Sequence, residues 1–256
     1  MSTDALNGEV IWVTGASSGI GRELALQLAA RGNRVLITGR NQQALQELAE
    51  GSVGDLVPVP GDIAAADAAE SLQAKLEAAS PWLDRIILNA GTCEYFDVKQ
   101  PDWGMLRRIM EVNFFGSINC LQAALPLLEQ HRIGRGHVVA IGSQASRAAF
   151  PRSQAYGASK AALSYFMQCM AVDMQQRGID VTVVQPGFVD TPLTRKNDFP
   201  MPFVMSVEKA AKIILNKVAK RPLLVQFPTR LNAVLALAEL APQFWCRRIV
   251  ARRSRA

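Results

Sequence analysis

The feature that most restricts the fold is a strand-like run that leads directly into a glycine-rich turn and a helix. Residues 9–14 form a short apolar run, which is typical of a strand buried in a parallel sheet. The turn that follows places Gly15, Gly19 and Gly21 in a GxxxGxG spacing, and a helical pattern continues to Gly32. Glycines permit a tight turn close to a ligand, and the start of a helix offers free N–H groups and a positive dipole end. We therefore predict a phosphate-binding turn after the first strand.

The same unit of strand and helix repeats along the chain. Further strands are predicted at residues 34–38, 56–60, 85–88, 137–142, 179–184 and 223–227, with helical patterns between most of them. This alternation predicts an α/β fold with a single Rossmann-type doubly wound parallel sheet of about seven strands flanked by helices. Such sheets bind ligands at the carboxyl ends of their strands. We expect one dinucleotide-binding catalytic domain over residues 1–227 and a C-terminal helical extension over residues 228–256.

The charge and the cysteines narrow the class of protein. The net charge is +6, but five of these charges belong to arginines after residue 246 with no acid among them, so residues 1–246 carry only +1. The arginines are Arg247, Arg248, Arg252, Arg253 and Arg255. A basic tail on a nearly neutral body argues against nucleic-acid binding. The four cysteines have neither disulfide nor metal spacing, and no secretory signal opens the chain, so we expect a cytoplasmic protein without a metal site.

Two positions after later strands bear on the choice of cofactor. The strand at 34–38 ends in Gly39 and Arg40, without the acid that would bind the ribose hydroxyls of NAD. An arginine at this point meets the 2′-phosphate of NADP, so Arg40 favours NADP over NAD; the alternative is a solvated residue at the start of a helix. Asp62 follows the next strand, and it either caps the helix predicted over residues 64–79 or hydrogen-bonds the adenine.

Small and polar residues mark the next two elements. The strand at 85–88 ends in Asn-Ala-Gly at residues 89–91, which either lets the chain pass beneath a cofactor or forms an ordinary turn. A long helical pattern covers residues 102–131. Asn113 lies on its apolar side, where an amide is either a satisfied core residue or a polar group at a site. Pro126 in the same pattern predicts a kink or a break.

Tyr156 and Lys160 lie four residues apart within a predicted helix over residues 155–177, so their side chains project from one face. A phenol in water loses its proton only near about pH 10, and a cation about 4 Å away is worth roughly 4 kcal/mol at an effective dielectric of about 20. The pair could therefore bring the phenol to a pKa useful for acid–base chemistry. Ser143 ends the preceding strand, and its hydroxyl could orient a carbonyl against Tyr156.

Together these pieces resemble the short-chain dehydrogenase/reductase family in its single-domain branch. They occur in the family's order and spacing over residues 8–227. The chain departs from the family pattern at Leu88, where relatives often have a second asparagine, and in its long C-terminal extension. The matching pieces are Thr-Gly-Ala-Ser-Ser-Gly-Ile-Gly at 14–21, Asp62, Asn-Ala-Gly at 89–91, Asn113, Ser143, Tyr-Gly-Ala-Ser-Lys at 156–160, and Pro-Gly at 186–187 with Thr191.

The resemblance implies an NAD(P)-dependent oxidoreductase that transfers a hydride between nicotinamide and a carbonyl or secondary alcohol, in a homodimer or homotetramer. Tyr156 would be the acid–base catalyst, and Lys160 would lower its pKa and hold the nicotinamide ribose. Ser143 would stabilise the substrate oxygen, and Asn113 would anchor a water-linked proton relay. The implied cofactor contacts are Gly15, Ser17, Ser18, Gly19, Ile20, Gly21, Arg40, Asp62, Ile63, Asn89, Ala90, Gly91, Tyr156, Lys160, Pro186, Gly187, Val189 and Thr191.

The extension after residue 227 leaves three readings open. Residues 231–240 form an apolar helical pattern, and Phe244, Trp245, Ile249 and Val250 then alternate with arginines. Charged residues and prolines interrupt any run of about 20 apolar residues, so a membrane span is not expected. The extension either packs on its own domain, lies in a membrane interface or covers a subunit contact.

The substrate pocket is expected to be apolar, with a lid over residues 188–205 before a helix that starts near Ser206. This favours a hydrophobic small-molecule carbonyl or alcohol. The alternative function is a catalytically silent nucleotide-binding or scaffold protein of the same fold, which would be free to lose the residues that do chemistry. The other expected walls are Cys93, Tyr95, Phe96, Phe150 and Pro151.

Overall fold

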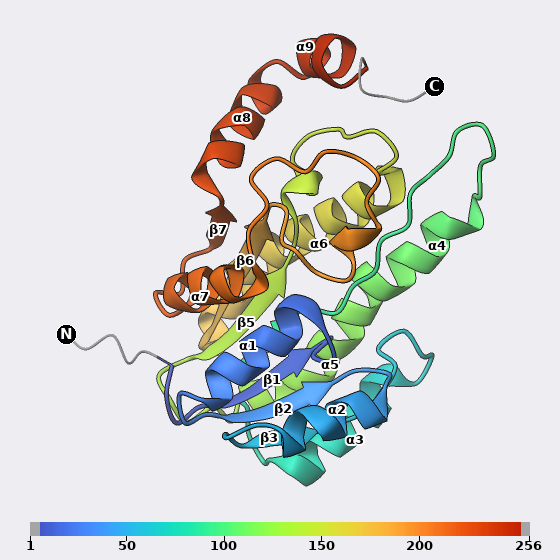
Figure 1. The fold of residues 1–256 in the computed structure, drawn as a ribbon. Helices are drawn as coiled ribbons and strands as arrows, with labels where there is room; N and C mark the ends of the chain where they lie inside the picture. Colours follow the sequence, from blue (N-terminus) through green and yellow to red (C-terminus); the bar gives the residue numbers. More distant parts are fainter. Residues whose placement is uncertain (1–5, 252–256) are drawn as a thin grey trace.

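The computed structural model describes residues 6–251, and its centre is a seven-stranded sheet in which each strand runs parallel to its neighbours (Figure 1). The strand order is β3-β2-β1-β4-β5-β6-β7, so the chain winds outward from β1 in both directions. The predicted α/β class and doubly wound sheet are confirmed. The strands are β1 (Val10–Thr14), β2 (Arg34–Thr38), β3 (Leu56–Pro58), β4 (Arg85–Leu88), β5 (Gly136–Ile141), β6 (Ile179–Pro186) and β7 (Leu224–Phe227).

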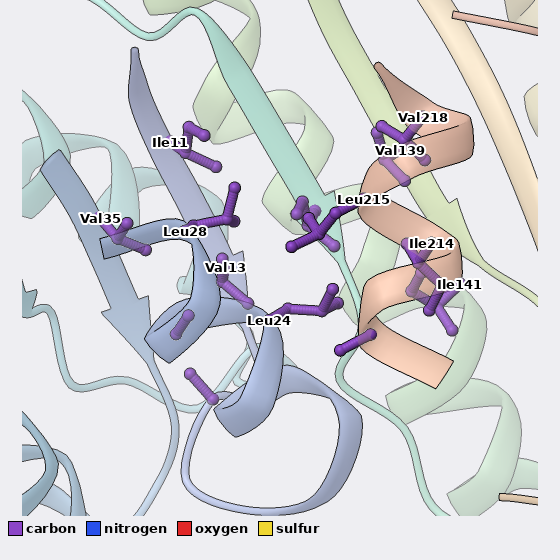
Figure 2. Close-up of a cluster of buried hydrophobic side chains, with 14 of the residues drawn as sticks. Ile11, Val13, Leu24, Leu28, Val35, Val139, Ile141, Ile214, Leu215 and Val218 are labelled. Carbon is purple, nitrogen blue, oxygen red and sulfur yellow. The ribbon is translucent and has the colours of Figure 1, made fainter. Parts of the chain in front are cut away.

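Helices cover both faces of this sheet and bury a separate core on each. Alternate residues of β1 point to opposite faces, so that Ile11 and Val13 join one core and Trp12 joins the other. In the first core, Leu24 and Leu28 of one helix pack towards Leu215 of another helix on the same face of the sheet (Figure 2). This face carries α1 (Gly19–Ala29), α2 (Gln42–Glu50) and α7 (Val207–Val218), and the opposite face carries α3 (Ala68–Ala79), α5 (Gly116–Leu128) and α6 (Gln154–Asp173).

The long helical pattern at 102–131 forms three consecutive segments. These are α4 (Gly104–Met110), a π-helical turn (Glu111–Phe115) and α5. The turn was not predicted, and it contains Asn113. The prediction of a break at Pro126 is wrong, because the helix continues through this residue to Leu128. The buried Leu127 and Leu128 pack the last turn against the core.

The start of α3 differs from the prediction by four residues. The helix begins at Ala68 rather than at residue 64, with Asp67 at its N-cap position. Asp62 Oδ1 instead accepts a hydrogen bond from the Ala64 amide at 3.0 Å, which closes a short turn. The reading of Asp62 as the cap of this helix is therefore wrong.

The chain after β7 forms an extension that stands out from the sheet and its helices (Figure 1). It contains α8 (Thr229–Leu240), α9 (Pro242–Phe244) and a π-helical segment (Trp245–Val250). Leu231, Leu235 and Ala238 are buried, so one side of α8 packs on its own domain. None of the helices in residues 6–251 is both long and apolar enough to cross a membrane. The arginines at 252, 253 and 255 lie outside the described residues.

A buried polar network joins the strands at the amino edge of the sheet. Arg85 forms a bidentate ion pair with Glu9, with distances of 2.9 Å from Nε to Oε2 and 3.0 Å from Nη2 to Oε1. Its Nη1 also donates to His137 Nδ1. His137 Nε2 then lies 2.8 Å from Thr182 Oγ1, which donates to the Pro222 carbonyl. These groups lie at the edge opposite to the predicted site.

Candidate active site

The glycine turn between β1 and α1 is locked by residues that follow β4. Gly15 has a φ of 67°, and a Cβ there would lie 2.7 Å from Ala90 Cα. The Asn89 side chain donates to the carbonyls of Thr14 and Gly15 at 3.0 and 3.2 Å. A Cβ at Gly21 would lie 2.3 Å from the same amide nitrogen, so only glycine fits at position 21. Asn89 therefore fixes the turn from within the protein.

Thr14 belongs to the matching piece at 14–21 but was not among the predicted site residues. Its Oγ1 accepts hydrogen bonds from the backbone amides of Asn89 and Ala90 at 3.0 and 3.1 Å. The hydroxyl thus ties the end of β1, where the glycine turn begins, to the residues that follow β4. A hydroxyl as the last residue of a buried apolar strand was the available signal.

The first turn of α1 is open to an anionic ligand. The helix begins at Gly19, and the Ser18 side chain at its N-cap makes no capping hydrogen bond. The N–H groups at a helix start, together with its positive dipole end, favour a phosphate. The geometry of the turn and the free helix start fit the pyrophosphate of a dinucleotide.

A cavity of about 500 Å³ lies over the carboxyl edge of the sheet, next to this turn. Almost every predicted site residue lines it; Gly21, which lies beneath the turn, and Asn113 do not. Thr92, Glu94, Arg108 and Val112 also line the cavity and were not predicted, because nothing in their spacing distinguishes them from loop and helix residues. The predicted residues that line it are Gly15, Ser17, Ser18, Gly19, Ile20, Arg40, Asp62, Ile63, Asn89, Ala90, Gly91, Ser143, Tyr156, Lys160, Pro186, Gly187, Val189 and Thr191.

One end of the cavity lies beyond β2 and β3. Arg40 is exposed there, and a Cβ at Gly39 would lie 3.4 Å from Ser17 Oγ, so the Ser17 hydroxyl faces the end of β2. Asp62 is exposed at the end of β3, beside the buried Ile63. This end offers a cation, a hydroxyl and a carboxylate to a ligand.

The three predicted catalytic residues Ser143, Tyr156 and Lys160 line the other end of the cavity, over β5 and β6. Ser143 Oγ accepts from the Ala145 amide at 3.1 Å and shares a hydrogen bond with the Tyr156 phenol. Burial raises the pKa of Tyr156 to about 12, and the bond with Ser143 opposes that rise. Lys160 Nζ donates to the Ile141 carbonyl at 2.8 Å, and burial lowers the pKa of Lys160 to about 8. The expectation that Lys160 lowers the pKa of Tyr156 stays a prediction.

Asn113 lies behind this centre rather than in the cavity. Its Oδ1 accepts from the Thr92 amide at 2.7 Å, and its Nδ2 donates to the Thr92 carbonyl and to Ser159 Oγ, both at 2.9 Å. A Cβ at Gly91 would lie 3.2 Å from Asn113 Oδ1 and 3.4 Å from Lys160 Nζ. The Asn113 side chain therefore joins the loop after β4 to α6, close to Lys160.

The segment at residues 188–205, the predicted lid, contributes aromatic rings that pack around Tyr95, which interacts electrostatically with Tyr156. Phe199 packs against Tyr95 at 5.6 Å between ring centroids and against Phe188 at 6.2 Å. Arg152 lies over the Tyr95 ring at 5.2 Å, and it forms an ion pair with Asp198 of the lid at 2.9 Å.

Other expected wall residues of the pocket face other partners. Phe96 is buried in a small cluster with Met105, Ile109 and Ala155, and Phe150 packs on Trp245 of the extension at 5.8 Å. Cys93 interacts electrostatically with Tyr156 and Lys160, so its thiol lies in the neighbourhood of the predicted catalytic residues. Within residues 6–251, no three or more His, Cys, Asp or Glu side chains group in a way that could hold a metal ion.

Comparison with known proteins agrees with this geometry. A sequence model of the short chain dehydrogenase family matches residues 9–200. An uncharacterized oxidoreductase of Myxococcus xanthus is 38% identical over 233 residues, which cover 90% of this chain and 91% of the relative. Dehydrogenase/reductase SDR family member 7B of Mus musculus is 36% identical over 74% of this chain and 60% of the relative. An 11-beta-hydroxysteroid dehydrogenase 1A of Arabidopsis thaliana is 30% identical over 94% of this chain and 74% of the relative.

Solved structures share the fold over nearly their whole length. A short chain dehydrogenase from Burkholderia cenocepacia in complex with NADP has a TM-score of 0.81 and 27% identity, covering 95% of this chain and 98% of that one. The RhlG/NADP active-site complex of Pseudomonas aeruginosa has a TM-score of 0.79 and 26% identity, covering 89% and 98%. The chain belongs to the short-chain dehydrogenase/reductase family. It is an oxidoreductase of CH–OH and C=O groups that uses a nicotinamide dinucleotide.

Proposed function

We propose that this chain is an NADP(H)-dependent reductase of apolar carbonyl compounds in which Tyr156 is the acid–base catalyst. The observation that carries the proposal is that Tyr156, Ser143 and Lys160 line the same cavity as the glycine turn. One site thus offers a seat for a dinucleotide and a proton donor for a carbonyl oxygen. When bound, the nicotinamide supplies or accepts the hydride.

Tyr156 provides the proton that a reduced carbonyl oxygen needs. Because burial raises its pKa to about 12, the phenol holds its proton throughout the neutral range. Ser143 shares a hydrogen bond with this phenol, so its hydroxyl can orient the carbonyl oxygen towards the proton. In alcohol oxidation the same phenol oxygen accepts a proton, which is easier at high pH.

Lys160 supports this chemistry from beneath. With a pKa of about 8, its amine is mostly charged at pH 7, so it can hold the nicotinamide ribose and favour the phenolate. Asn113 supports the loop at Thr92 and helix α6 through Ser159, and we assign the anchor of a proton relay to it.

Arg40 supports NADP over NAD. It is exposed beside the cavity at the end of β2, where the 2′-phosphate of a bound dinucleotide would lie, and Ser17 lies next to it. Both NADP complexes named above belong to the same fold. Arg40→Ala is expected to raise the KM for NADPH by about 10- to 100-fold, the value of a charge-assisted hydrogen bond, and to leave the KM for NADH unchanged. An equal change with both cofactors would contradict the preference.

The aromatic lid supports an apolar substrate. Tyr95, Phe188 and Phe199 pack together, and Tyr95 interacts electrostatically with Tyr156. Relatives named as hydroxysteroid dehydrogenases agree with a substrate of this kind.

The test is a screen of apolar ketones, a steroid ketone among them, with NADPH and with NADH. NADPH oxidation by the wild-type protein, lost in Tyr156→Phe with unchanged NADPH binding, is the expected result. Retained turnover in this variant would remove Tyr156 from the mechanism. NADPH binding without turnover on any carbonyl would favour the catalytically silent nucleotide-binding protein instead.

We further propose a homodimer or homotetramer built on α5 and α6. Tyr165 and Val172 of α6 are 75% and 72% exposed, and the nearby Phe115 is 47% exposed, which is a large apolar surface for a helix pair to leave in water. Light scattering on a size-exclusion column is expected to give at least twice the mass of one chain. A Tyr165→Glu variant that stays associated would contradict this surface.

We place the protein in the cytoplasm, with residues 1–227 as the catalytic domain. The outer side of α8 and α9 supports peripheral contact with the inner face of a membrane, because Val234, Leu237, Leu240 and Phe244 are exposed beside Arg247. Flotation with anionic liposomes is expected for the wild-type chain and not for Leu237→Glu. Equal behaviour of the two would end the membrane proposal and leave α8 as a helix packed only on its own domain.

A further inference from the structure

The extension after β7 begins against a turn that lines the cavity. A Cβ at Gly187 would lie 2.8 Å from Leu231 Cδ2 and 2.9 Å from Pro228 Cδ, so the start of the extension fills the space beside this residue. The side chain of Gln144, which directly follows Ser143, donates to the Phe227 carbonyl at 3.0 Å. The extension therefore starts in contact with the end of β6, and the residue just before it, the last of β7, is bonded to the residue that follows Ser143.

An ion pair then joins α8 to the segment between Ser143 and Tyr156. Arg147 donates from Nε and Nη2 to the two carboxylate oxygens of Glu239, both at 2.7 Å, and from Nη1 to Asn232 Oδ1. The Arg147 side chain is only 9% exposed. A bidentate guanidinium pair of this kind fixes orientation as well as distance. Asn232 and Glu239 lie two helical turns apart on one side of α8, so they hold the guanidinium between them.

Trp245 makes a second connection to the same segment. Its indole N–H donates to the Ala149 carbonyl at 2.7 Å, and its ring packs edge-on against Phe150 at 5.8 Å and 83°. An indole that satisfies a backbone carbonyl and stacks on a neighbouring ring is a strong local anchor.

Residues 144–153, here called the catalytic loop, connect the serine and the tyrosine of the reaction centre. The loop is tied at its start by the bond from Ala145 N to Ser143 Oγ and at its end by a 2.7 Å bond from Gly157 N to the Ser153 carbonyl. Its middle, from Arg147 to Phe150, is held by the extension. We propose that the extension positions Ser143 against Tyr156 through this loop, with Arg147 and Trp245 as positioning residues for the carbonyl reduction proposed above, on which this role rests.

Loss of either connection should affect the chemical step and spare the far end of the cofactor site. The glycine turn and Arg40 lie on other elements, β1–α1 and the end of β2, and the connections from Arg147 and Trp245 do not reach them. A loosened loop would let the Ser143 hydroxyl move away from the phenol, and small misplacements of reacting groups are costly in rate.

The experiment compares Glu239→Ala and Trp245→Ala in the full chain, with Arg230→Ala as the control because it removes a charge from the exposed side of the same helix. The expected result is a fall in kcat of about 10- to 100-fold in the first two, with the KM for NADPH within about twofold and no change in the control. Glu239→Arg should be at least as slow as Glu239→Ala, and the reversal pair Arg147→Glu with Glu239→Arg should recover most of the rate. An unchanged kcat in both alanine variants would overturn the positioning role.

Hydrogen–deuterium exchange separates this inference from the proposed function. Amides of residues 144–157 should exchange faster in both alanine variants, with exchange over residues 10–38 unchanged, whether or not any carbonyl is reduced. If the wild-type protein reduces no carbonyl, the proposed function fails, and exchange alone decides whether the extension holds the loop. Unchanged exchange in residues 144–157 overturns it. If Trp245→Ala does not fold, Trp245→Phe keeps an aromatic ring against Phe150 and removes the N–H donor to the Ala149 carbonyl, so it provides the same comparison.

Discussion

Each of the two edges of the sheet buries a cation, but the two cations differ in how many hydrogen-bond partners they have. At the amino edge, Arg85 is matched by both carboxylate oxygens of Glu9 and by His137. At the carboxyl edge, within the described chain, Lys160 Nζ makes one hydrogen bond, to the Ile141 carbonyl, although an ammonium has three donors.

The difference separates a cation that stabilises the fold, Arg85, from a cation with donors available to a ligand, Lys160. A buried charge that is paired with a carboxylate is costly to disturb, because loss of the partner leaves the charge buried without compensation. A buried amine with unused donors carries a desolvation cost, which its lowered pKa records, and keeps its donors for a ligand. Removal of a charge should therefore have opposite effects on stability at the two edges.

The largest effect is expected for Lys160→Met. Turnover should fall by roughly 100-fold or more, because the variant loses both the proposed contact with the nicotinamide ribose and the proposed support of the phenolate by a cation. Stability should rise by about 1–3 kcal/mol, because the penalty for a lysine held at a pKa of about 8 disappears. Urea unfolding at pH 7 and at pH 10 checks the cause: the penalty is complete below about pH 8 and fades towards pH 10.5, so the gain should shrink at pH 10. A loss of stability at pH 7 would break the comparison.

Glu9→Gln should show the reverse pattern. It leaves the Arg85 charge buried without its carboxylate, which is expected to cost about 3–5 kcal/mol of unfolding free energy. Activity per folded molecule should not change, because the cluster lies at the other edge from the cavity. Denaturant unfolding and turnover corrected for the folded fraction measure the two. A fall in corrected turnover would mean that the edges are coupled.

Gly21→Ala tests whether the backbone at the carboxyl edge, at the glycine turn, can shift to accommodate a side chain. The new Cβ would lie 2.3 Å from Asn89 Nδ2, and forcing it in should cost about 1–3 kcal/mol of stability and weaken NADPH binding. Gly51→Ala is the matched control, since its Cβ would meet only the Glu47 carbonyl at 3.2 Å. Equal stability of the two variants would show that the turn yields easily.

The smallest effect is a pH dependence at the amino edge. Burial, and then the charge of Arg85, lowers the pKa of His137 well below its ordinary 6.5. Below about pH 6.5, His137 therefore binds a proton in the unfolded chain but not in the folded one. The free energy of unfolding consequently falls as the pH falls, by up to about 1.4 kcal/mol per pH unit. The slope of unfolding free energy against pH between 6.5 and 5 should be smaller in His137→Leu than in the wild type. Equal slopes would show that His137 does not titrate in this way.

The sheet could be predicted from the sequence because its signals are local. Continuous apolar runs and glycine stops set the strands, and the observed strands begin and end within one or two residues of the predicted ones. Gly178, with a φ of 71°, ends the α6 region where predicted, and Ser206 caps α7 through the Lys209 amide. The start of α3 was missed because Asp62 closes its own turn with Ala64.

The site residues of the glycine turn and the Tyr156 helix could be named because backbone shape and helix spacing require them. The π-helical turn at Asn113 and the Glu9–Arg85–His137 network could not, because each depends on contacts between residues far apart in the chain. Arg85 looks from its sequence like the exposed start of a strand, and only its pairing with Glu9, immediately before the neighbouring strand β1, explains its burial. The partners of Arg147 and Trp245 were missed for the same reason.

The locked glycine turn has a thermodynamic consequence. The amide of Asn89 and the hydroxyl of Thr14 shape it through contacts internal to the protein, so its segments do not have to order when a dinucleotide arrives. Preorganisation of this kind spares the entropy that an unstructured loop would lose. Calorimetry of NADPH binding should then show only the modest negative heat-capacity change of covering the ligand, without the large change of coupled folding.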